Sequence, residues 1–228
     1  MHKNKQQFIG KGVYSNVYEY FENKKNVIKI YKISNNIEEQ RKYYDAFCNE
    51  LYNLSAVQNI DKKVKKHIPL LVDYKFEGHT KENYIVMPKY NHINNKSKDY
   101  TETMFRKDMN DLKILLETLN RFHITHNDIK WKNLCRDNKG NIVLIDWNLS
   151  KIEENTNKIS NDQHDLALMI VEHLFGQDIY EERLNVYEDN EKEDWVYLDE
   201  EFYYNQEIWE ESEETLYWQT FSINLLKI

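Results

Sequence analysis

The sequence lacks the features that would place it in a membrane or in the disulfide-rich secreted class. It has two cysteines in 228 residues, Cys48 and Cys135, so no disulfide framework is expected. We expect both thiols to be reduced, in a cytoplasmic setting. Its apolar runs fall far short of the roughly 20 residues that a membrane helix needs. The first seven residues contain no apolar stretch, so no secretory signal is expected either.

The composition is that of a folded protein whose charge is unevenly spread. Aromatic residues make up 14% of the chain, which argues against general disorder. The formal net charge is -8, but residues 178–214 hold sixteen acidic and two basic residues, which leaves about +6 for the remainder. This disfavours nucleic-acid binding through the whole surface. It leaves room for a basic face on the part of the chain before residue 178, suited to a polyanionic nucleotide.

The final segment, residues 177–228, alternates carboxylates with aromatic and aliphatic side chains. This alternation predicts helices that pack onto the second half of the fold. The carboxylates indicate a solvated face, and a docking surface for a basic partner is the alternative.

One stretch carries the side chains that suit phosphate chemistry. It runs from His126 to Asn133 and is followed by a four-residue apolar strand that leads into Asp146. Asp128 is a carboxylate that could orient or deprotonate a hydroxyl, and Lys130 adds a positive charge where a transferring phosphoryl group would lie. Asn133 and Asp146 offer oxygen ligands of the kind that Mg²⁺ prefers. An isolated Asp-x-x-x-x-Asn means little, but this order before an apolar strand is specific.

Two further patterns lie near the N-terminus. Residues 8–20 read as strand, tight turn and strand, in which Gly10 and Gly12 let the backbone approach a phosphate; alone, the pattern fits a plain hairpin. The next strand, residues 26–31, contains Lys29 among apolar residues, where an unpaired charge is costly. An edge-strand lysine that points to water is the alternative to a phosphate ligand.

The remaining periodicities predict more strands and three helices. Strands at 68–74 and 84–90 would complete a five-stranded antiparallel sheet, and the polar residues 91–100 predict a loop at a lobe boundary. The predicted helices span residues 37–58, 108–123 and 161–175. Glu50 lies on the first of these helices.

These motifs, in this order, resemble the protein kinase family: a Gly-rich turn, a strand lysine, a helix glutamate, a catalytic loop and a metal-binding strand end. The family's Ala-Pro-Glu motif is absent and the segment after Asp146 is short. The chain therefore looks most like minimal kinases of the RIO-like, viral or bacterial-effector type. The resemblance implies an α+β, bilobal fold. Residues 1–90 would form a lobe of antiparallel sheet plus one helix, and residues 91–228 a mostly helical lobe.

The resemblance gives each candidate site residue a role. Asp128, Lys130 and Lys29 would be catalytic, with Asp128 as the base, and Asn133 and Asp146 would hold Mg²⁺. ATP is the implied nucleotide. The residues implied to bind it are Ile9, Gly10, Lys11, Gly12, Val13, Tyr14, Ser15, Val17, Val27, Lys29, Glu50, Met87, Lys89 and Cys135.

Three departures from the family pattern lead to specific expectations. Asn127 replaces the usual arginine, which implies activity without a phosphorylated activation segment. Trp147 and Asn148 replace Phe-Gly, and asparagine is among the few residues that tolerate left-handed backbone geometry. Pro88 has no N–H, so the N–H of Lys89 is the expected hinge donor to adenine.

Three side chains have expected structural roles. His126 would anchor the catalytic loop from beneath, and Asp165 would hydrogen-bond the backbone of that loop. Resemblance to the protein kinase family implies that Glu50 pairs with Lys29, and a solvated helix-face charge is the alternative. The remaining histidines show no convincing metal-ligand spacing.

The resulting prediction is a Ser/Thr protein kinase that transfers the γ-phosphate of ATP to a hydroxyl of a protein substrate. We expect no nucleic-acid or membrane partner, and a host-cell setting if the protein is viral or an effector. A small-molecule kinase of the aminoglycoside or choline type, which Asp146-Trp147 favours, is one alternative. A pseudokinase that binds a partner protein is another alternative. Such proteins typically lose the strand lysine, the base or a metal ligand, and none of these is lost here. A plain structural domain would leave the ordered motifs as coincidence.

Overall fold

The computed structural model describes residues 7–152 and 161–175. The chain forms two compact units, Met1–Thr156 and Asn157–Ile228, and each is described by itself. The acidic segment at 177–228 and Gly176, which was expected to end the last helix, lie outside the described residues. Among the residues that are described, no helix is both long enough and apolar enough to cross a bilayer.

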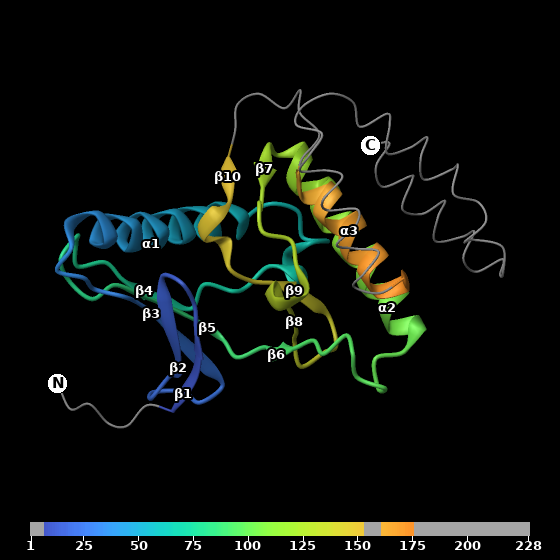
Figure 1. The fold of residues 1–228 in the computed structure, drawn as a ribbon, viewed down its shortest axis with the longest axis horizontal. Helices are drawn as coiled ribbons and strands as arrows, with labels where there is room; N and C mark the ends of the chain where they lie inside the picture. The colour runs from blue at the N-terminus through green and yellow to red at the C-terminus, as the bar shows by residue number, and fades with distance from the viewer. Residues whose placement is uncertain (1–6, 153–160, 176–228) are drawn as a thin grey trace. The chain divides into compact units, whose positions relative to one another are not determined.

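The first unit begins with the predicted five-stranded antiparallel sheet, seen at the lower left of Figure 1. The strands lie in the order β1-β2-β3-β5-β4. Their bounds are Phe8–Lys11 (β1), Ser15–Glu19 (β2), Asn26–Tyr31 (β3), Asp73–Lys75 (β4) and Tyr84–Pro88 (β5). The strand predicted over 68–74 is wrong in extent, because only its last two residues belong to β4. A 3-10 turn, η1 (Lys65–His67), precedes it, and Pro69 has no N–H to donate.

The register of the strands gives the sheet two different faces. Lys29 lies directly opposite Val17 and Ile85, and Val27 lies opposite Met87. Opposite residues of an antiparallel pair share a face, so four residues predicted to bind nucleotide or its phosphates lie on the same side. The other face carries an apolar cluster of Tyr20, Ile28 and Val86, against which Tyr18, Ile30 and Tyr84 pack.

Helix α1 (Ile37–Val57) covers the face that carries Lys29. The Asn36 side chain caps it by accepting hydrogen bonds from the N–H groups of Glu38 and Glu39, at 2.9 and 3.1 Å. The buried side of the helix includes three polar residues, Gln40, Glu50 and Asn53, which are almost entirely shielded from water. Burying polar groups costs free energy unless they are bonded, so this side of α1 does more than fill a core. Its buried apolar residues are Ala46, Phe47, Leu54 and Val57.

The rest of the first unit consists of one long helix and several short elements. Helix α2 (Glu102–Arg121) begins six residues before the predicted start, because the Thr101 hydroxyl accepts a hydrogen bond from the N–H of Met104 at 3.3 Å and caps the helix there. A short strand, β6, lies within the predicted loop 91–100. The short elements are β6 (Asn91–His92), β7 (Ile124–Thr125), η2 (Trp131–Asn133), β8 (Leu134–Arg136), β9 (Ile142–Leu144), η3 (Trp147–Leu149) and β10 (Lys151–Ile152).

These short strands pair in two groups. Strands β6, β8 and β9 form a three-stranded sheet in that order, and β7 pairs with β10. All of these pairings are antiparallel. In the second unit, helix α3 (Asn161–Phe175) forms over the predicted range. The role expected of Asp165, on this helix, stays a prediction.

A buried ion pair between α2 and β8 braces the first unit. Asp108 is fully buried on the apolar side of α2, and its carboxylate accepts two hydrogen bonds from Arg136 of β8, at 2.5 and 3.2 Å. The Tyr100 hydroxyl donates a third, at 2.9 Å. Because Arg136 ends the strand that follows Asn133, this brace fixes β8 against α2.

Replacing Asp108 with alanine should therefore lower the free energy of unfolding by about 3–5 kcal/mol, because it leaves Arg136 without its buried partner. Urea denaturation measures this. The matched control is Lys107→Ala on the same helix, which removes a more exposed pair with Asp111 at 2.8 Å and should cost about 0–1 kcal/mol. Equal losses in the two variants would show that the brace contributes no special stability.

Candidate active site

The stretch from His126 to Asn133, called the catalytic stretch for its predicted role, forms a hydrogen-bonded loop between β7 and β8. Lys130 donates from Nζ to Asp128 Oδ1 at 2.6 Å. The side-chain nitrogen of Asn133 donates to Asp128 twice, to Oδ2 at 2.7 Å and to the main-chain oxygen at 2.9 Å. Both oxygens of the Asp128 carboxylate are therefore held in place. Since the amide nitrogen of Asn133 is committed to Asp128, its amide oxygen points the other way and is available to a cation.

The β8–β9 pairing brings Asn133 next to Asp146. Leu134 lies opposite Leu144, and the N–H of Ile145 donates to the Asn133 carbonyl at 2.9 Å. Asp146 directly follows Ile145. The two residues predicted to hold Mg²⁺, thirteen positions apart in the sequence, thus sit at the adjoining ends of paired strands.

The left-handed backbone geometry lies at Asp146, and Asn148, which would tolerate it, does not adopt it. Asp146 has φ 71° and ψ 65°, whereas Asn148 lies within the 3-10 turn η3. The chain therefore makes this turn two residues before Asn148, at the aspartate predicted to bind the metal. Aspartate, like asparagine, visits this region more readily than most residues.

Lys29 bridges two carboxylates from distant parts of the chain. Its Nζ lies 2.6 Å from Glu50 Oε2 and 2.6 Å from Asp146 Oδ1. Burial alone would lower the pKa of Lys29, but the two carboxylates outweigh it and raise the pKa. For Asp146, burial acts upward, yet Lys29 brings the pKa below its ordinary value. The Lys29–Glu50 ion pair predicted from the sequence is formed, and its lysine is joined to the metal aspartate.

Two aromatic rings pack beneath this loop. Trp147 is fully buried, and its Nε1 donates to the Leu144 carbonyl at 2.9 Å. The His126 ring meets it edge-on, with the ring centroids 4.9 Å apart, and is itself fully buried. Burial lowers the pKa of His126 to about 4. His126 is thus packed inside the fold against Trp147, and its expected role as an anchor of the loop stays a prediction.

The Gly-rich turn joins β1 and β2 and is held from outside by a lysine. The N–H of Gly12 donates to Ser15 O at 2.8 Å, and Lys32 donates from Nζ to the carbonyl oxygens of Gly12, at 2.8 Å, and of Val13. A methyl group added at Gly10 would meet no atom within 4 Å. Space within the fold therefore does not require glycine there.

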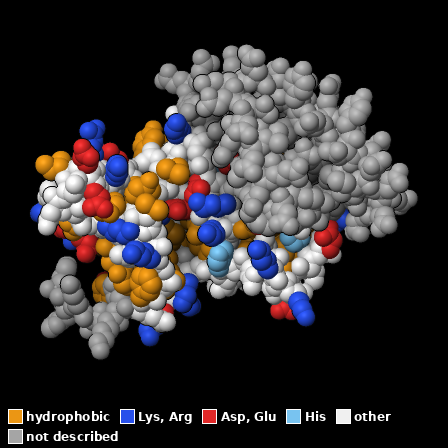
Figure 2. Space-filling model, in the orientation of Figure 1, with side chains coloured by type: hydrophobic (Ala, Val, Ile, Leu, Met, Phe, Trp, Pro, Cys, Tyr) orange, Lys and Arg blue, Asp and Glu red, His pale blue; other side chains and the backbone are white. Residues whose placement is uncertain are grey.

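Apolar side chains are exposed around this turn. Figure 2 shows hydrophobic side chains at the surface on the lower left of the molecule, the region where Figure 1 has the five-stranded sheet. Ile9 and Val13 are 42% and 73% exposed, while Ser15 is buried. Apolar groups that flank a phosphate-sized turn are suited to contact a flat heterocycle. The predicted binding residues Lys11 and Tyr14 belong to the same turn.

The hinge after β5 differs from the expectation in one respect. The N–H of Lys89 donates to the Lys25 carbonyl at 2.8 Å, so it is already bonded and its expected role as the adenine donor is wrong in this structure. The next N–H along the hinge belongs to Tyr90. Cys135 lies on β8 opposite His92, the second residue of β6, which places this predicted binding residue beside the strand that follows the hinge.

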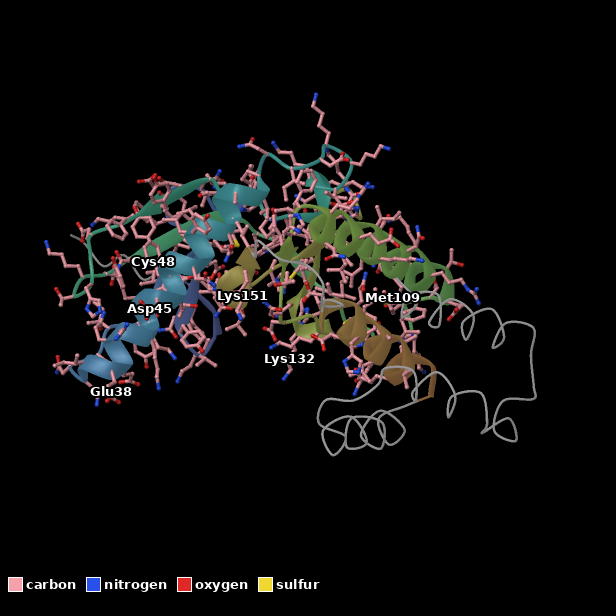
Figure 3. The ribbon with its side chains drawn as sticks, turned by 90° about the horizontal axis from the view of Figure 1, so that it is seen from above. Glu38, Asp45, Cys48, Met109, Lys132 and Lys151 are labelled. Atoms are coloured by element: carbon pink, nitrogen blue, oxygen red, sulfur yellow. The ribbon has the colours of Figure 1, made fainter. Side chains whose placement is uncertain are left out.

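Sequence reasoning missed two residues that tie α1 to the segment after Asp146. Asn49 donates to the carbonyls of Asn148 and Ser150 at 2.5 and 3.0 Å, and Asn53 donates to Ser150 O at 2.9 Å. Figure 3 shows α1, labelled at Asp45 and Cys48, beside β10, labelled at Lys151. The available signal was their spacing. Asn49 and Asn53 lie four residues apart, so they fall on one side of the helix, close to Glu50.

The donor chemistry of the site fits a magnesium ion bound together with phosphates. Asn133 supplies an amide oxygen and Asp146 a carboxylate whose side chain is 36% exposed. A protein site with few ligands of its own, completed by phosphate oxygens and water, is typical of Mg²⁺. Within the described residues, no group of three or more His, Cys, Asp or Glu side chains is placed to hold a metal.

Comparison with known proteins shows the family to which the chain belongs. Residues 3–188 match the protein kinase domain family, which is well over half of the chain. The chain therefore belongs to the protein kinase family, with the α+β fold expected from its sequence.

Two curated relatives narrow the likeness. The chain is 32% identical over 111 residues to a probable serine/threonine-protein kinase of Dictyostelium discoideum, a match that covers 46% of this chain and 24% of the relative. It is 29% identical over 150 residues to the serine/threonine-protein kinase sgk-1 of Caenorhabditis elegans, covering 63% of this chain and 31% of that protein. The chain thus spans only about a quarter to a third of the length of these relatives.

Acidification should destabilise the protein through His126. With a folded pKa of about 4 against an ordinary value of 6.5, the unfolded chain binds the proton first. Stability that is present above pH 6.5 is therefore lost as the pH falls toward 4, at up to about 1.4 kcal/mol per pH unit. His67, whose pKa burial also lowers, acts in the same direction. NMR titration of the His126 ring checks the cause, and a ring that becomes charged near pH 6.5 in the folded protein would contradict it.

Proposed function

We propose that this protein is an ATP- and Mg²⁺-dependent Ser/Thr protein kinase that transfers the γ-phosphate to a hydroxyl of a protein substrate. The observation that carries the proposal is the convergence of four groups remote in sequence. Lys29 contacts Asp146 at 2.6 Å, Asn133 contacts Asp128 at 2.7 Å, and Ile145 bonds the Asn133 backbone at 2.9 Å. Family membership and the two relatives support the same reading.

The nucleotide would bind across the face of the sheet that carries Lys29. The Gly-rich turn offers main-chain N–H groups to phosphates, and Lys29 offers a charge that its carboxylate partners hold in place. Val17, Val27 and Met87 share that face and would contact the heterocycle, with Cys135 on the neighbouring sheet. The N–H of Tyr90 replaces that of Lys89 as the proposed hinge donor.

The catalytic loop would orient the acceptor hydroxyl. Asp128 is held by Asn133 and Lys130, so its carboxylate has a fixed direction for accepting or orienting the hydroxyl proton. Lys130, which is paired with Asp128 and whose side chain is 49% exposed, would offset charge on the transferred group. Mg²⁺ bound to Asn133 and Asp146 would neutralise phosphate charge. Most of the rate would come from placement and charge stabilisation.

The site is proposed to work without phosphorylation of the segment after Asp146. Asn127 has a left-handed backbone, φ 62°, and its side-chain nitrogen donates to Leu149 O at 3.1 Å and to Thr125 Oγ1 at 2.9 Å. These neutral bonds join the loop that carries Asp128 to the segment after Asp146 without a phosphate. A minimal kinase of the RIO-like, viral or effector type is the proposed subtype.

We also propose that residues 1–90 and 91–228 form the two lobes. The partner would be a protein substrate, and no nucleic-acid or membrane partner is expected. The setting would be cytoplasmic. The acidic segment would have a solvated face, and a basic partner is the alternative.

Asp128→Ala tests the function directly. Phosphate transfer from radiolabelled ATP to proteins of a cell extract should fall about 10²–10⁴-fold, because the group that orients the hydroxyl is lost. Nucleotide binding, measured by calorimetry, should persist. The control is Asp99→Ala, an exposed aspartate outside the site, which should keep full activity.

Other outcomes separate the alternatives. Phosphate that appears only on aminoglycosides or choline would overturn the protein-kinase assignment in favour of a small-molecule kinase. Equal inactivity of wild type and Asp128→Ala would favour a pseudokinase that binds a partner protein.

Gly10→Ala tests whether the turn is shaped for a phosphate. The added methyl meets open space, so stability should stay the same or rise by up to about 1 kcal/mol, while the affinity for Mg·ATP should fall about tenfold, or ~1.4 kcal/mol. Thermal unfolding and calorimetry measure the two effects. Gly140→Ala is the opposite control, because its φ of 80° predicts lost stability and unchanged affinity. Unchanged affinity in Gly10→Ala would contradict a close phosphate approach.

A further inference from the structure

The carboxylate of Glu50 has a second partner that the kinase motifs do not explain. Glu50 Oε2 accepts a hydrogen bond from Lys29 Nζ at 2.6 Å and another from the hydroxyl of Tyr31. The other oxygen, Oε1, has no hydrogen-bond partner among the described residues. One carboxylate oxygen therefore carries all the hydrogen bonds that hold this fully buried group.

Tyr31 is placed for this contact by the strand itself. It lies two residues after Lys29 on β3, so both side chains leave the same face of the sheet toward α1. Tyr31 is 3% exposed, and its ring packs edge-on against Phe47 of α1, with centroids 5.1 Å apart. The Lys29 ammonium lies 5.7 Å from the centre of the same ring. The phenol is therefore fixed by its packing and reaches Glu50 as a neutral donor.

The two partners of Glu50 differ in what a nucleotide does to them. On the proposed function, Lys29 shares its charge with phosphates, and Asp146 turns to a metal. The bonds that Lys29 makes in this structure are then divided among more acceptors. Tyr31 has no part in phosphate binding, so its bond to Glu50 stays the same.

We propose that Tyr31 is a positioning residue that holds Glu50, and through it α1, in place while Lys29 engages the nucleotide. The inference rests on the proposed function for its effect on catalysis. Its structural part, the tether from β3 to α1, stands without that function. Tyr31 acts through Glu50 on the direction of the Lys29 ammonium.

Tyr31→Phe removes the hydroxyl and keeps the ring against Phe47. The KM for ATP should rise about tenfold or more, the range expected for a lost hydrogen bond to a charged group, while the KM for the protein substrate stays unchanged. A merely structural defect would lower the fraction of active enzyme, and so kcat, without raising the KM for ATP. An unchanged KM for ATP in an active enzyme overturns the proposal.

A matched control and a double-mutant cycle sharpen this test. Tyr43 also donates to a glutamate of α1, Glu39, at 2.5 Å, but on the exposed side of the helix; Tyr43→Phe should leave both KM values unchanged. In a Glu50→Gln background, Tyr31→Phe should have little further effect on the KM for ATP. Independent, multiplying effects of the two substitutions would overturn the proposed route through Glu50.

Hydrogen exchange of the full-length protein separates this inference from the proposed function. Without the tether, amides in the middle of α1 should exchange about tenfold faster or more in Tyr31→Phe than in wild type, while β8 and β9 keep their protection. If wild type transfers no phosphate, the proposed function fails, yet faster exchange in α1 still supports the tether. Unchanged exchange in α1 refutes the tether whatever the activity.

Discussion

The burial of one lysine between two carboxylates is the constraint on which the site depends. A charge inside an apolar strand is tolerated only when it is paired, and Lys29 is paired with Glu50 from α1 and with Asp146 from the end of β9. Each partner comes from a different part of the chain. Satisfying this one charge therefore fixes the sheet, the helix and the segment after β9 relative to each other within the first unit.

The polar contacts around α1 extend the same logic. Asn49 and Asn53 hold the carbonyls that follow Asp146, and Tyr31 holds Glu50. The buried side of α1 is therefore a row of hydrogen-bonding groups instead of a purely apolar stripe. Such a network orients side chains closely but depends on every member being satisfied. On the proposed role of Tyr31, a change at one member would alter the direction of Lys29 through Glu50.

The sequence was sufficient where the chemistry is local or the charge is exceptional. Lys29 was identified because a lysine in an apolar strand needs a reason, and the catalytic stretch because of its spacing. Tyr31 escaped notice because tyrosine is common in strands, and its role appears only when α1 lies above it. The hinge donor was misassigned for a similar reason: the carbonyl of Lys25, far from Lys89 in sequence, accepts its N–H.

The core residue Asp108 shows that a charged residue within an apolar pattern carries information about the fold. It sits on the apolar stripe of α2, where a charge is out of place, and that mismatch signals a buried partner. The partner itself, Arg136, could not be inferred, because the pairing depends on how β8 crosses the helix. The left-handed turn at Asp146 was likewise beyond reach, since Asp146 and Asn148 are both tolerant of that geometry.

The lysine outside the Gly-rich turn has a consequence for the interior of that turn. Lys32 attracts the carbonyl oxygens of Gly12 and Val13. In a trans peptide the C=O and the following N–H point in opposite directions. Drawing two successive oxygens to one side thus aims the N–H groups of Val13 and Tyr14 to the other, as a pair of parallel donors. Lys32 can in this way orient two N–H donors toward a common acceptor through bonds to the backbone alone.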